Sequence, residues 1–203
     1  MQLLLATHNL HKIIEFKAIL KHELVDVDII TLREFPHYLP QEESGGTFVA
    51  NSELKAVSAA KALGYYTLAD DSGLVIPALD GEPGIKSRRY SGEDASDEDN
   101  RKKLIKKLKE IDEEKRFGYY ECALCLASPE GIIKTVIGKC EGSLILEPKG
   151  SFGFGYDSLF IKYDYNKTMA ELKEEVKNRI SHRRRAIDKL IEVLRGILSP
   201  ITS

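Results

Sequence analysis

The stretch YTLADDSGLVIP, residues 66–77, places two adjacent carboxylates and a Ser-Gly pair inside an otherwise apolar run. Residues 67–69 and 74–76 predict two buried strands, joined by a turn at Ser72 and Gly73. Burying an ionised carboxylate without a partner costs roughly several kcal/mol. Asp70 and Asp71 therefore indicate either a functional site or a structural turn in which they accept backbone hydrogen bonds.

A hard cation such as Mg²⁺ is a suitable partner for carboxylates at the end of a buried strand. Because adjacent residues of a strand point to opposite faces, we expect only one of Asp70 and Asp71 to face such a site. We expect the other to accept hydrogen bonds from nearby backbone N–H groups. On this interpretation the partner of the carboxylates is a metal rather than another side chain.

Working outward from this stretch, strand and helix patterns alternate. Residues 3–6 and VDVDII, residues 25–30, predict strands, and an apolar stripe at Ile13, Phe16 and Leu20 predicts a helix between them. Thr47 is predicted to cap a helix over residues 48–63. Residues 117–127 and 132–140 flank SPEG and predict a hairpin. Further helices are expected around Leu104, Leu108 and Ile111 and near the C-terminus. The order predicts an α/β protein with a mixed sheet.

Composition narrows the class of protein. The 203 residues carry a formal net charge of −2, which argues against a nucleic-acid partner. The three cysteines, Cys122, Cys125 and Cys140, are too sparse for a disulfide framework and fit a reducing cytosol. Cys122 and Cys125 lie three apart in a predicted strand, so their thiols should point to opposite faces. No apolar run approaches the ~18 residues of a membrane span. We expect a soluble cytoplasmic protein.

Two segments near the N-terminus carry candidate functional groups. ATHNLHK joins a strand to a helix, so backbone N–H groups and the helix dipole could bind phosphate, aided by Thr7, Asn9 and Lys12. A plain N-cap with a solvated lysine is the alternative. PQEESGGTF places Glu42 and Glu43 beside two glycines, and it matters only if it folds towards Asp71. Asn51 and Lys55 are four residues apart and so share a helix face. A simple pair on the protein surface is the alternative interpretation.

Two later segments are candidates for nucleotide recognition. FGFGYD combines glycines with aromatic rings that could stack on a base or could simply complete the core. In KNRISHRRRAIDKL, helical spacing places Arg183 on the face of Ile187 and Leu190, so its guanidinium needs an anion or another acceptor inside the protein. A general basic patch for RNA is the alternative, and the net acidity weakens it.

Taken together, six motifs resemble the inosine triphosphate pyrophosphatase family of non-canonical purine nucleoside triphosphate pyrophosphatases. They occur in the order LLLATHNLHK, EESGGTFVANSELKA, ADDSGLVIPALDGEPGIKSRRYSGEDA, GFGYD, TMAEL and ISHRRRA, along nearly the whole chain. The resemblance implies a single domain over residues 1–203, with an elongated two-lobed α/β fold, a central mixed sheet flanked by helices and an active-site cleft between the lobes. It also implies a cytoplasmic homodimer that hydrolyses ITP, dITP and XTP to monophosphate and pyrophosphate with Mg²⁺.

The resemblance also implies roles for individual residues. Glu42 and Asp71 would hold the metal, and Asp71 would also be the proton acceptor. In the mechanism that we expect, Lys55 is the second catalytic candidate, because its charge could offset that of the phosphates. The residues implied to bind substrate are Thr7, His8, Asn9, Leu10, His11, Lys12, Ser72, Phe154, Gly155, Tyr156, Asp157, Lys177, His182 and Arg183. His8 and His11 depart from the pattern, because relatives usually have glycine there.

Two other functions are alternatives to hydrolysis of a nucleotide. Asp-Ser-Gly after an apolar strand also opens the aspartic-protease motif, but such proteases are nearly all-β and this chain has several helical patterns. A nucleotide-binding sensor would use the same pocket without turnover, and the altered phosphate turn keeps this alternative open.

Overall fold

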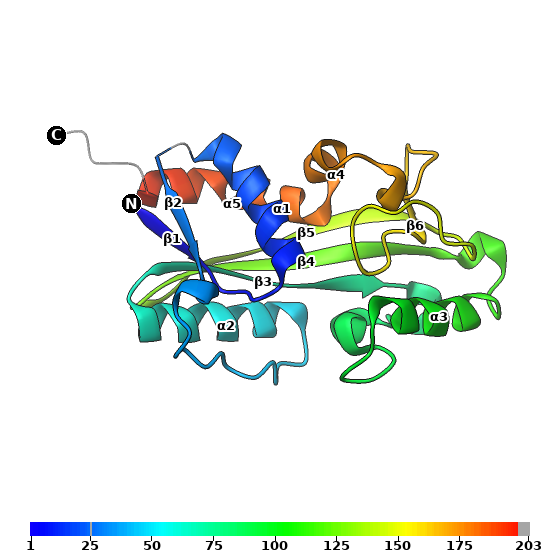
Figure 1. The fold of residues 1–203 in the computed structure, drawn as a ribbon, viewed down its shortest axis with the longest axis horizontal. Helices are drawn as coiled ribbons and strands as arrows, with labels where there is room; N and C mark the ends of the chain where they lie inside the picture. Colours follow the sequence, from blue (N-terminus) through cyan, green and yellow to red (C-terminus); the bar gives the residue numbers. More distant parts are fainter. Residues whose placement is uncertain (25, 199–203) are drawn as a thin grey trace. The chain divides into compact units, whose positions relative to one another are not determined.

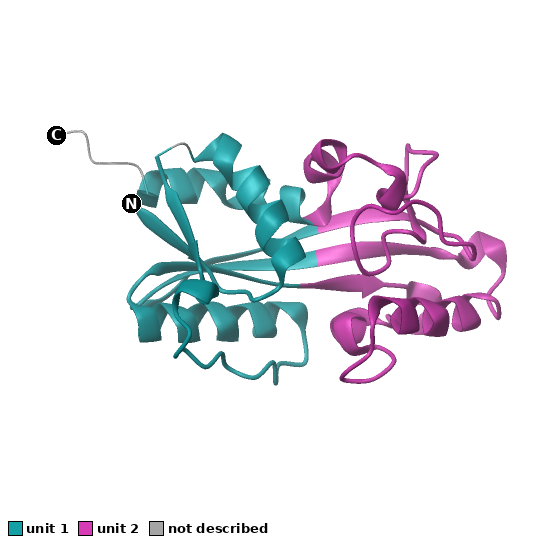
Figure 2. Ribbon diagram, viewed as in Figure 1, with its two compact units in different colours: residues 1–71, 122–138, 183–203 teal, residues 72–121, 139–182 magenta. Residues whose placement is uncertain are grey.

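The computed structural model describes residues 1–24 and 26–198; Val25, the first residue of the strand predicted over 25–30, lies outside them. The chain divides into two compact units (Figure 2). Unit 1 comprises Met1–Asp71, Cys122–Gly138 and Arg183–Ser203, and unit 2 comprises Ser72–Glu121 and Lys139–His182. The chain first passes from unit 1 to unit 2 between Asp71 and Ser72, inside the 66–77 stretch.

Six strands form one sheet in the described part of the chain, in the order β2-β1-β3-β4-β5-β6 (Figure 1). Their bounds are Gln2–Leu5 for β1, Asp28–Thr31 for β2, Tyr66–Val75 for β3, Phe117–Ser128 for β4, Gly131–Leu144 for β5 and Phe160–Lys162 for β6. β1 pairs in parallel with β2 and β3, whereas β5 and β6 are antiparallel. The mixed sheet predicted from the sequence is confirmed.

The α-helices are α1 (Leu10–Glu23), α2 (Phe48–Leu63), α3 (Asp97–Leu108), α4 (Glu174–Ile180) and α5 (His182–Leu198). Both bounds of α2 agree with the prediction, and Thr47 caps it by accepting a hydrogen bond from the Ala50 N–H group at 3.1 Å. α3 ends before Ile111, which packs on the core from outside the helix. None of the described helices has the length and apolar character needed to cross a membrane.

The core of unit 1 lies on both faces of its strands. On one face, Leu5, Leu68 and Cys122 pack with residues of α1 and α5. On the other face, Ala69 and Cys125 pack with the alanines of α2. Figure 1 shows α1 and α5 on one side of these strands and α2 on the other. The prediction that the two thiols point apart is therefore confirmed, and both are free and buried.

The predicted turn at Ser72 and Gly73 is absent, because both residues lie within β3. The strand runs without a break from Tyr66 to Val75. Gly73 serves a different purpose, because a Cβ there would lie 2.3 Å from the Ser87 hydroxyl oxygen and 2.5 Å from the Gly84 carbonyl oxygen. Gly84 and Ser87 belong to a short 3-10 helix, Gly84–Arg89. Gly73 therefore allows this helix to lie directly on the strand.

Unit 2 has a core of its own. Leu74 and Ile76, at the end of β3, pack with Leu104 and Leu108 of α3 and with the buried ring of Phe160 in β6. The segment between Leu144 and Phe160 contributes further apolar side chains to the same cluster, including Tyr156 and Leu159. The FGFGYD segment is thus anchored in this core at its C-terminal end.

Candidate active site

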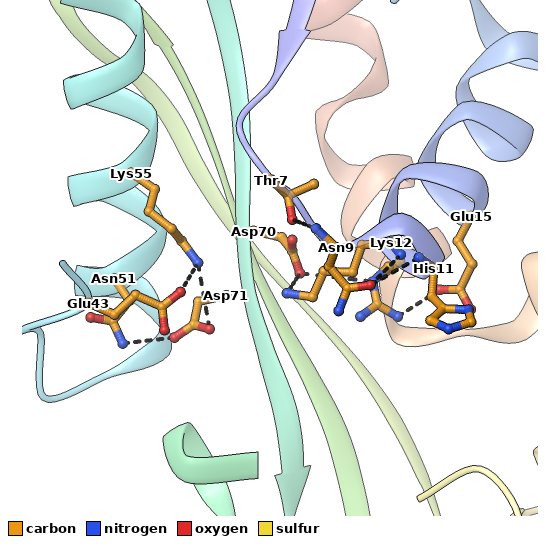
Figure 3. A network of polar contacts seen from close by, with 11 residues as sticks. Thr7, Asn9, His11, Lys12, Glu15, Glu43, Asn51, Lys55, Asp70 and Asp71 are labelled. Atoms are coloured by element: carbon orange, nitrogen blue, oxygen red, sulfur yellow. Dashed lines mark hydrogen bonds and ion pairs between the residues drawn. The ribbon is translucent and has the colours of Figure 1, made fainter. Parts of the chain in front are cut away.

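Asp70 and Asp71 lie on opposite faces of β3, as the strand geometry predicts. Asp70 follows the parity of Leu68, which packs with α1 and α5, and Asp71 follows that of Ala69, which packs with α2. Figure 3 shows the two carboxylates on opposite sides of the strand. One continuous strand therefore places the carboxylate of Asp70 on the side of α1 and α5 and that of Asp71 on the side of α2.

Asp71 lies against the side chains of α2. The Asn51 side-chain amide donates to Asp71 Oδ2 at 2.9 Å, and Lys55 Nζ lies 3.8 Å from Asp71 Oδ1 (Figure 3). Lys55 Nζ also donates to Glu43 Oε1 at 2.7 Å. Asn51 and Lys55 are one helical turn apart, which is why both reach the same carboxylate. The alternative of a bland surface pair is wrong, because Asn51 is buried.

Asp70 lies against cations from α1 and α5. Lys12 Nζ donates to Asp70 Oδ2 at 2.8 Å, and Arg183 Nε lies 3.9 Å from the same oxygen. Arg183 in turn donates through Nη1 to Glu15 Oε2 at 2.7 Å. The expected acceptor for the buried Arg183 is therefore Glu15. The sequence predicted that one aspartate accepts backbone hydrogen bonds and that the partner of the carboxylates is a metal rather than another side chain. Both predictions missed the ion pairs of Asp70 with Lys12 and Arg183.

The two carboxylates differ in electrostatics. Burial alone would raise the pKa of Asp70, but the charges of Lys12, Arg183 and Lys55 more than offset it, so its pKa lies well below the usual range. Burial raises the pKa of Asp71, and the opposing effect of Lys55 and Lys12 is too weak to cancel it. The pKa of Lys55 is raised, because nearby carboxylates outweigh its desolvation. Asp70 is thus a fixed anion, whereas Asp71 is the more easily protonated of the pair.

The turn before α1 has its own hydrogen bonds. Asn9 caps the helix by accepting from the N–H groups of His11 and Lys12 at 3.0 and 3.2 Å. Thr7 Oγ1 accepts from the Asn9 N–H group at 3.2 Å. These N–H groups, predicted to bind phosphate, therefore already have acceptors within the turn. The alternative of an N-cap is correct here, but Lys12 is ion-paired rather than solvated.

The acidic side chains near Asp71 have the donor chemistry that Mg²⁺ prefers. Glu42 and Glu43 are both exposed, and Glu43 accepts a hydrogen bond from Lys55. Among the described residues no group of three or more His, Cys, Asp or Glu side chains is arranged to hold a metal ion. Protein sites for Mg²⁺ commonly use only one or two carboxylates together with substrate phosphates and water. Asp71 with an acidic side chain of the 42–43 segment fits that kind of site.

In unit 2, a buried ion pair organises the FGFGYD segment. Asp157 Oδ2 accepts from Lys177 Nζ at 2.5 Å and from the Phe154 N–H group at 3.0 Å. Lys177 Nζ also lies 4.8 Å from the centroid of the Phe154 ring. Phe154, Asp157 and Lys177, predicted separately for nucleotide recognition, are thus in mutual contact.

Three further predicted residues lie in unit 2. The buried His182 stacks on Tyr120, with ring centroids 4.9 Å apart and planes inclined by 12°. The Tyr156 hydroxyl donates to the Ser87 carbonyl oxygen at 2.9 Å. Ser72 lies half-buried in β3. Tyr120 was missed by the sequence analysis because a tyrosine in a predicted strand gives no signal of a partner.

The predicted site residues are divided between the two units. Unit 1 holds Thr7, His8, Asn9, Leu10, His11, Lys12, Glu42, Lys55, Asp71 and Arg183, and unit 2 holds Ser72, Phe154, Gly155, Tyr156, Asp157, Lys177 and His182. Of the first group, His8, Leu10 and His11 are exposed. Glu15 was missed, although it lies at helical spacing from Lys12 and could have been found as the acidic residue on that face.

Fold and site together define an α/β protein whose mixed sheet carries a buried cluster of carboxylates and lysines. The chain belongs to the Ham1 family, whose model matches residues 3–193. A relative from Protochlamydia amoebophila, named dITP/XTP pyrophosphatase, is 52% identical over 97% of this chain and 99% of its own length. A relative of the same name from Chlamydia abortus is 44% identical, over 98% and 96% respectively.

Solved structures agree with this assignment. The Ham1 protein of Staphylococcus aureus superposes with a TM-score of 0.84 at 40% identity, covering 97% of this chain and 100% of that one. A HAM1 protein from Coxiella burnetii has a TM-score of 0.85 at 37% identity, with coverages of 97% and 99%. The resemblance found from the six sequence motifs is confirmed at the level of family and fold.

Proposed function

We propose that this chain is a nucleoside triphosphate pyrophosphatase that hydrolyses ITP, dITP and XTP to the monophosphate and pyrophosphate. The observation that carries the proposal is the placement of Asp71, a buried carboxylate of raised pKa held by Asn51 and close to Lys55. Its context supports the substrate class, because relatives that match this chain over nearly its full length are named dITP/XTP pyrophosphatases.

In this proposal Asp71 accepts the proton of a water molecule that attacks the α-phosphorus. The bond between the α-phosphorus and the bridging oxygen breaks, and pyrophosphate leaves with the electron pair. A general base is most effective when its pKa approaches the working pH, so the raised pKa of Asp71 suits this role. Lys55 and Lys12 offset negative charge on the triphosphate, since catalysis of this kind is mainly positioning and electrostatics.

We propose Mg²⁺ as the cofactor, held by Asp71 and Glu42, with Glu43 of the same segment already close to the site. When bound, Mg²⁺ would neutralise phosphate charge and lower the pKa of a nearby water. The donor set supports this assignment, because carboxylate oxygens are the ligands that hard cations prefer.

The preference for particular nucleobases follows from hydrogen-bond chemistry. Hypoxanthine and xanthine carry an acceptor at O6, whereas adenine carries a donor at that position. Donors from His182, Arg183 or the backbone of the 154–157 segment would bind O6 and leave adenine facing donor against donor. A site built to bond one polar group can reject the wrong analogue by about 10⁴-fold. The proposed assembly is a cytoplasmic homodimer that binds neither nucleic acid nor membranes.

Pyrophosphate release from ITP, XTP, GTP and ATP, measured in parallel with Mg²⁺ and with EDTA, tests the proposal. Metal-dependent release from ITP and XTP that greatly exceeds release from GTP and ATP is the expected result. Tight ITP binding without pyrophosphate release would instead support the sensor. Equal release from all four nucleotides would contradict the proposed substrate class.

A further inference from the structure

Gly155, in the middle of the FGFGYD segment, is held on both sides by one helix. Its N–H group donates to Asp97 Oδ2 at 2.7 Å, and its carbonyl oxygen accepts from Arg101 Nη1 at 2.8 Å. Asp97 and Arg101 are four residues apart in α3 and so share a face of that helix. Two charged side chains therefore fix both peptide groups of a residue whose φ of 60° favours glycine.

The first turn of α3 is itself firmly anchored. Ser96 and Asp99 form a capping box at its N-terminus. The buried Asn100 donates to the Arg88 carbonyl oxygen at 3.0 Å and accepts from the Ser91 N–H group at 2.8 Å. Asp97 and Arg101 therefore project from a fixed base, and hydrogen bonds to charged groups are stronger than those between neutral ones.

The Cα atom of Phe154 lies between two peptide N–H groups that are both hydrogen-bonded to aspartate side chains. Its own N–H group is bonded to Asp157, and the next N–H group along the chain, that of Gly155, is bonded to Asp97. Both peptide groups that flank the Phe154 Cα are thus restrained, one by the Lys177–Asp157 pair and the other by α3. The direction of the Phe154 side chain depends on both.

We propose that Asp97 and Arg101 are positioning residues for nucleotide recognition, acting through Gly155 on the orientation of Phe154. This inference rests on the proposed function, in which the 154–157 segment contacts the nucleoside. Asp97 and Arg101 set how well the nucleoside is bound, whereas the water attack depends on Asp71. Their loss therefore raises KM for ITP and leaves kcat nearly unchanged.

Alanine substitutions with matched controls test the inference. Asp97→Ala and Arg101→Ala should each raise KM for ITP about tenfold while kcat changes less than about twofold. Asp97→Asn keeps an acceptor and should restore most of the affinity. The controls are Glu98→Ala and Lys102→Ala, which remove the same charges from the same turns of α3 and break an exposed ion pair between these two side chains. Both should retain the KM of the unaltered chain.

A double variant tests whether the two residues act through the same group. If Asp97 and Arg101 both act through Gly155, the increase in KM for Asp97→Ala/Arg101→Ala should be clearly smaller than the product of the single increases. Independent, multiplicative effects would contradict a shared route through Gly155.

Hydrogen exchange provides a readout that does not depend on turnover. Asp97→Ala should speed amide exchange in the peptide covering residues 152–157, and Glu98→Ala should not. Unchanged exchange, or faster exchange with an unchanged KM, would overturn the inference. If the unaltered chain released no pyrophosphate from ITP or XTP, the proposed function would fail instead. Calorimetric affinity for IMP would then replace KM, and an affinity that is absent or equal in all variants would overturn the inference as well.

Discussion

Asp70 and Asp71 are neighbours in β3, yet Asp70 is paired with Lys12 at 2.8 Å and Asp71 is bonded to Asn51 at 2.9 Å on the opposite face. The pKa of the first is lowered by its cations and that of the second is raised by burial. The same residue type therefore has two roles, because Asp70 holds α1 and α5 to the strand and Asp71 faces the proposed reaction. The first prediction separates these roles.

Asp71→Asn should lower kcat for ITP by about 10²–10⁴-fold, because it removes the proton acceptor. Its free energy of unfolding should stay within about 1 kcal/mol of the unaltered chain, since a raised native pKa means that the charge of Asp71 does not stabilise the fold. Asp70→Asn should instead lower the free energy of unfolding by about 3 kcal/mol, because Lys12 and Arg183 lose their shared anion. Urea denaturation and initial rates measure both. The reverse pattern would refute this division of roles.

Asn51 links the proposed metal segment to Asp71, the carboxylate that we propose as the proton acceptor. Its Oδ1 accepts from the Gly45 N–H group at 2.8 Å while its amide nitrogen donates to Asp71. Asn51→Ala should therefore weaken the activation of ITP hydrolysis by Mg²⁺ by about 10–100-fold, as loss of a group that orients metal ligands typically does. Titration of the initial rate with Mg²⁺ measures this. Asn166→Ala, at an exposed asparagine, is the control, and equal Mg²⁺ dependence in both variants would count against the role of Asn51.

The Glu15–Arg183 pair is a test of buried against exposed charge. Both side chains are almost fully buried, at 7% and 3% exposure. Glu15→Gln should lower the free energy of unfolding by about 3 kcal/mol, because it leaves Arg183 with a weaker acceptor inside the protein. Glu192→Gln, which affects an exposed ion pair with Arg195, should cost less than about 1 kcal/mol. Similar losses in the two variants would show that burial does not decide the effect.

Gly73 gives a purely steric prediction. Gly73→Ala should lower the free energy of unfolding by about 1–3 kcal/mol, because the added methyl group collides with the 84–89 helix. Gly196→Ala is the matched control, since Gly196 lies within α5 and a Cβ there meets open space. It should stabilise the protein by about 0.5–1 kcal/mol. A stable Gly73→Ala protein would mean that the helix does not lie on β3.

Local patterns predicted much of this fold. The bounds of α2 follow from its N-cap and apolar spacing, and the long hairpin follows from two apolar runs around SPEG. The prediction of a turn at Ser72 and Gly73 was wrong. A glycine often marks a turn, but here it is needed because a Cβ at Gly73 would collide with Ser87. The ion pairs were beyond local reasoning, since Lys12 and Asp70 are 58 residues apart and Glu15 and Arg183 are 168 apart.

Some residues of the candidate site were predictable from the sequence and others were not. Asp71 and Lys55 were predicted from a buried carboxylate and a helix face, and the structure brings them within 3.8 Å of each other. Asp97 and Arg101 lie in a charged helix start that reads as solvated surface, so only the fold reveals their bonds to Gly155. The assignment of Glu42 and Asp71 as the metal ligands stays a prediction of the family resemblance.

Water that attacks the α-phosphorus of ITP must leave its oxygen on the monophosphate, so the position of a labelled oxygen tests the proposed reaction. ITP is hydrolysed by the unaltered chain in ¹⁸O-labelled water with Mg²⁺, and the products are identified by mass spectrometry. Attack at the α-phosphorus gives IMP carrying one ¹⁸O atom together with unlabelled pyrophosphate, and this is the expected result. Formation of IDP and labelled inorganic phosphate, or the absence of hydrolysis despite ITP binding, would contradict it.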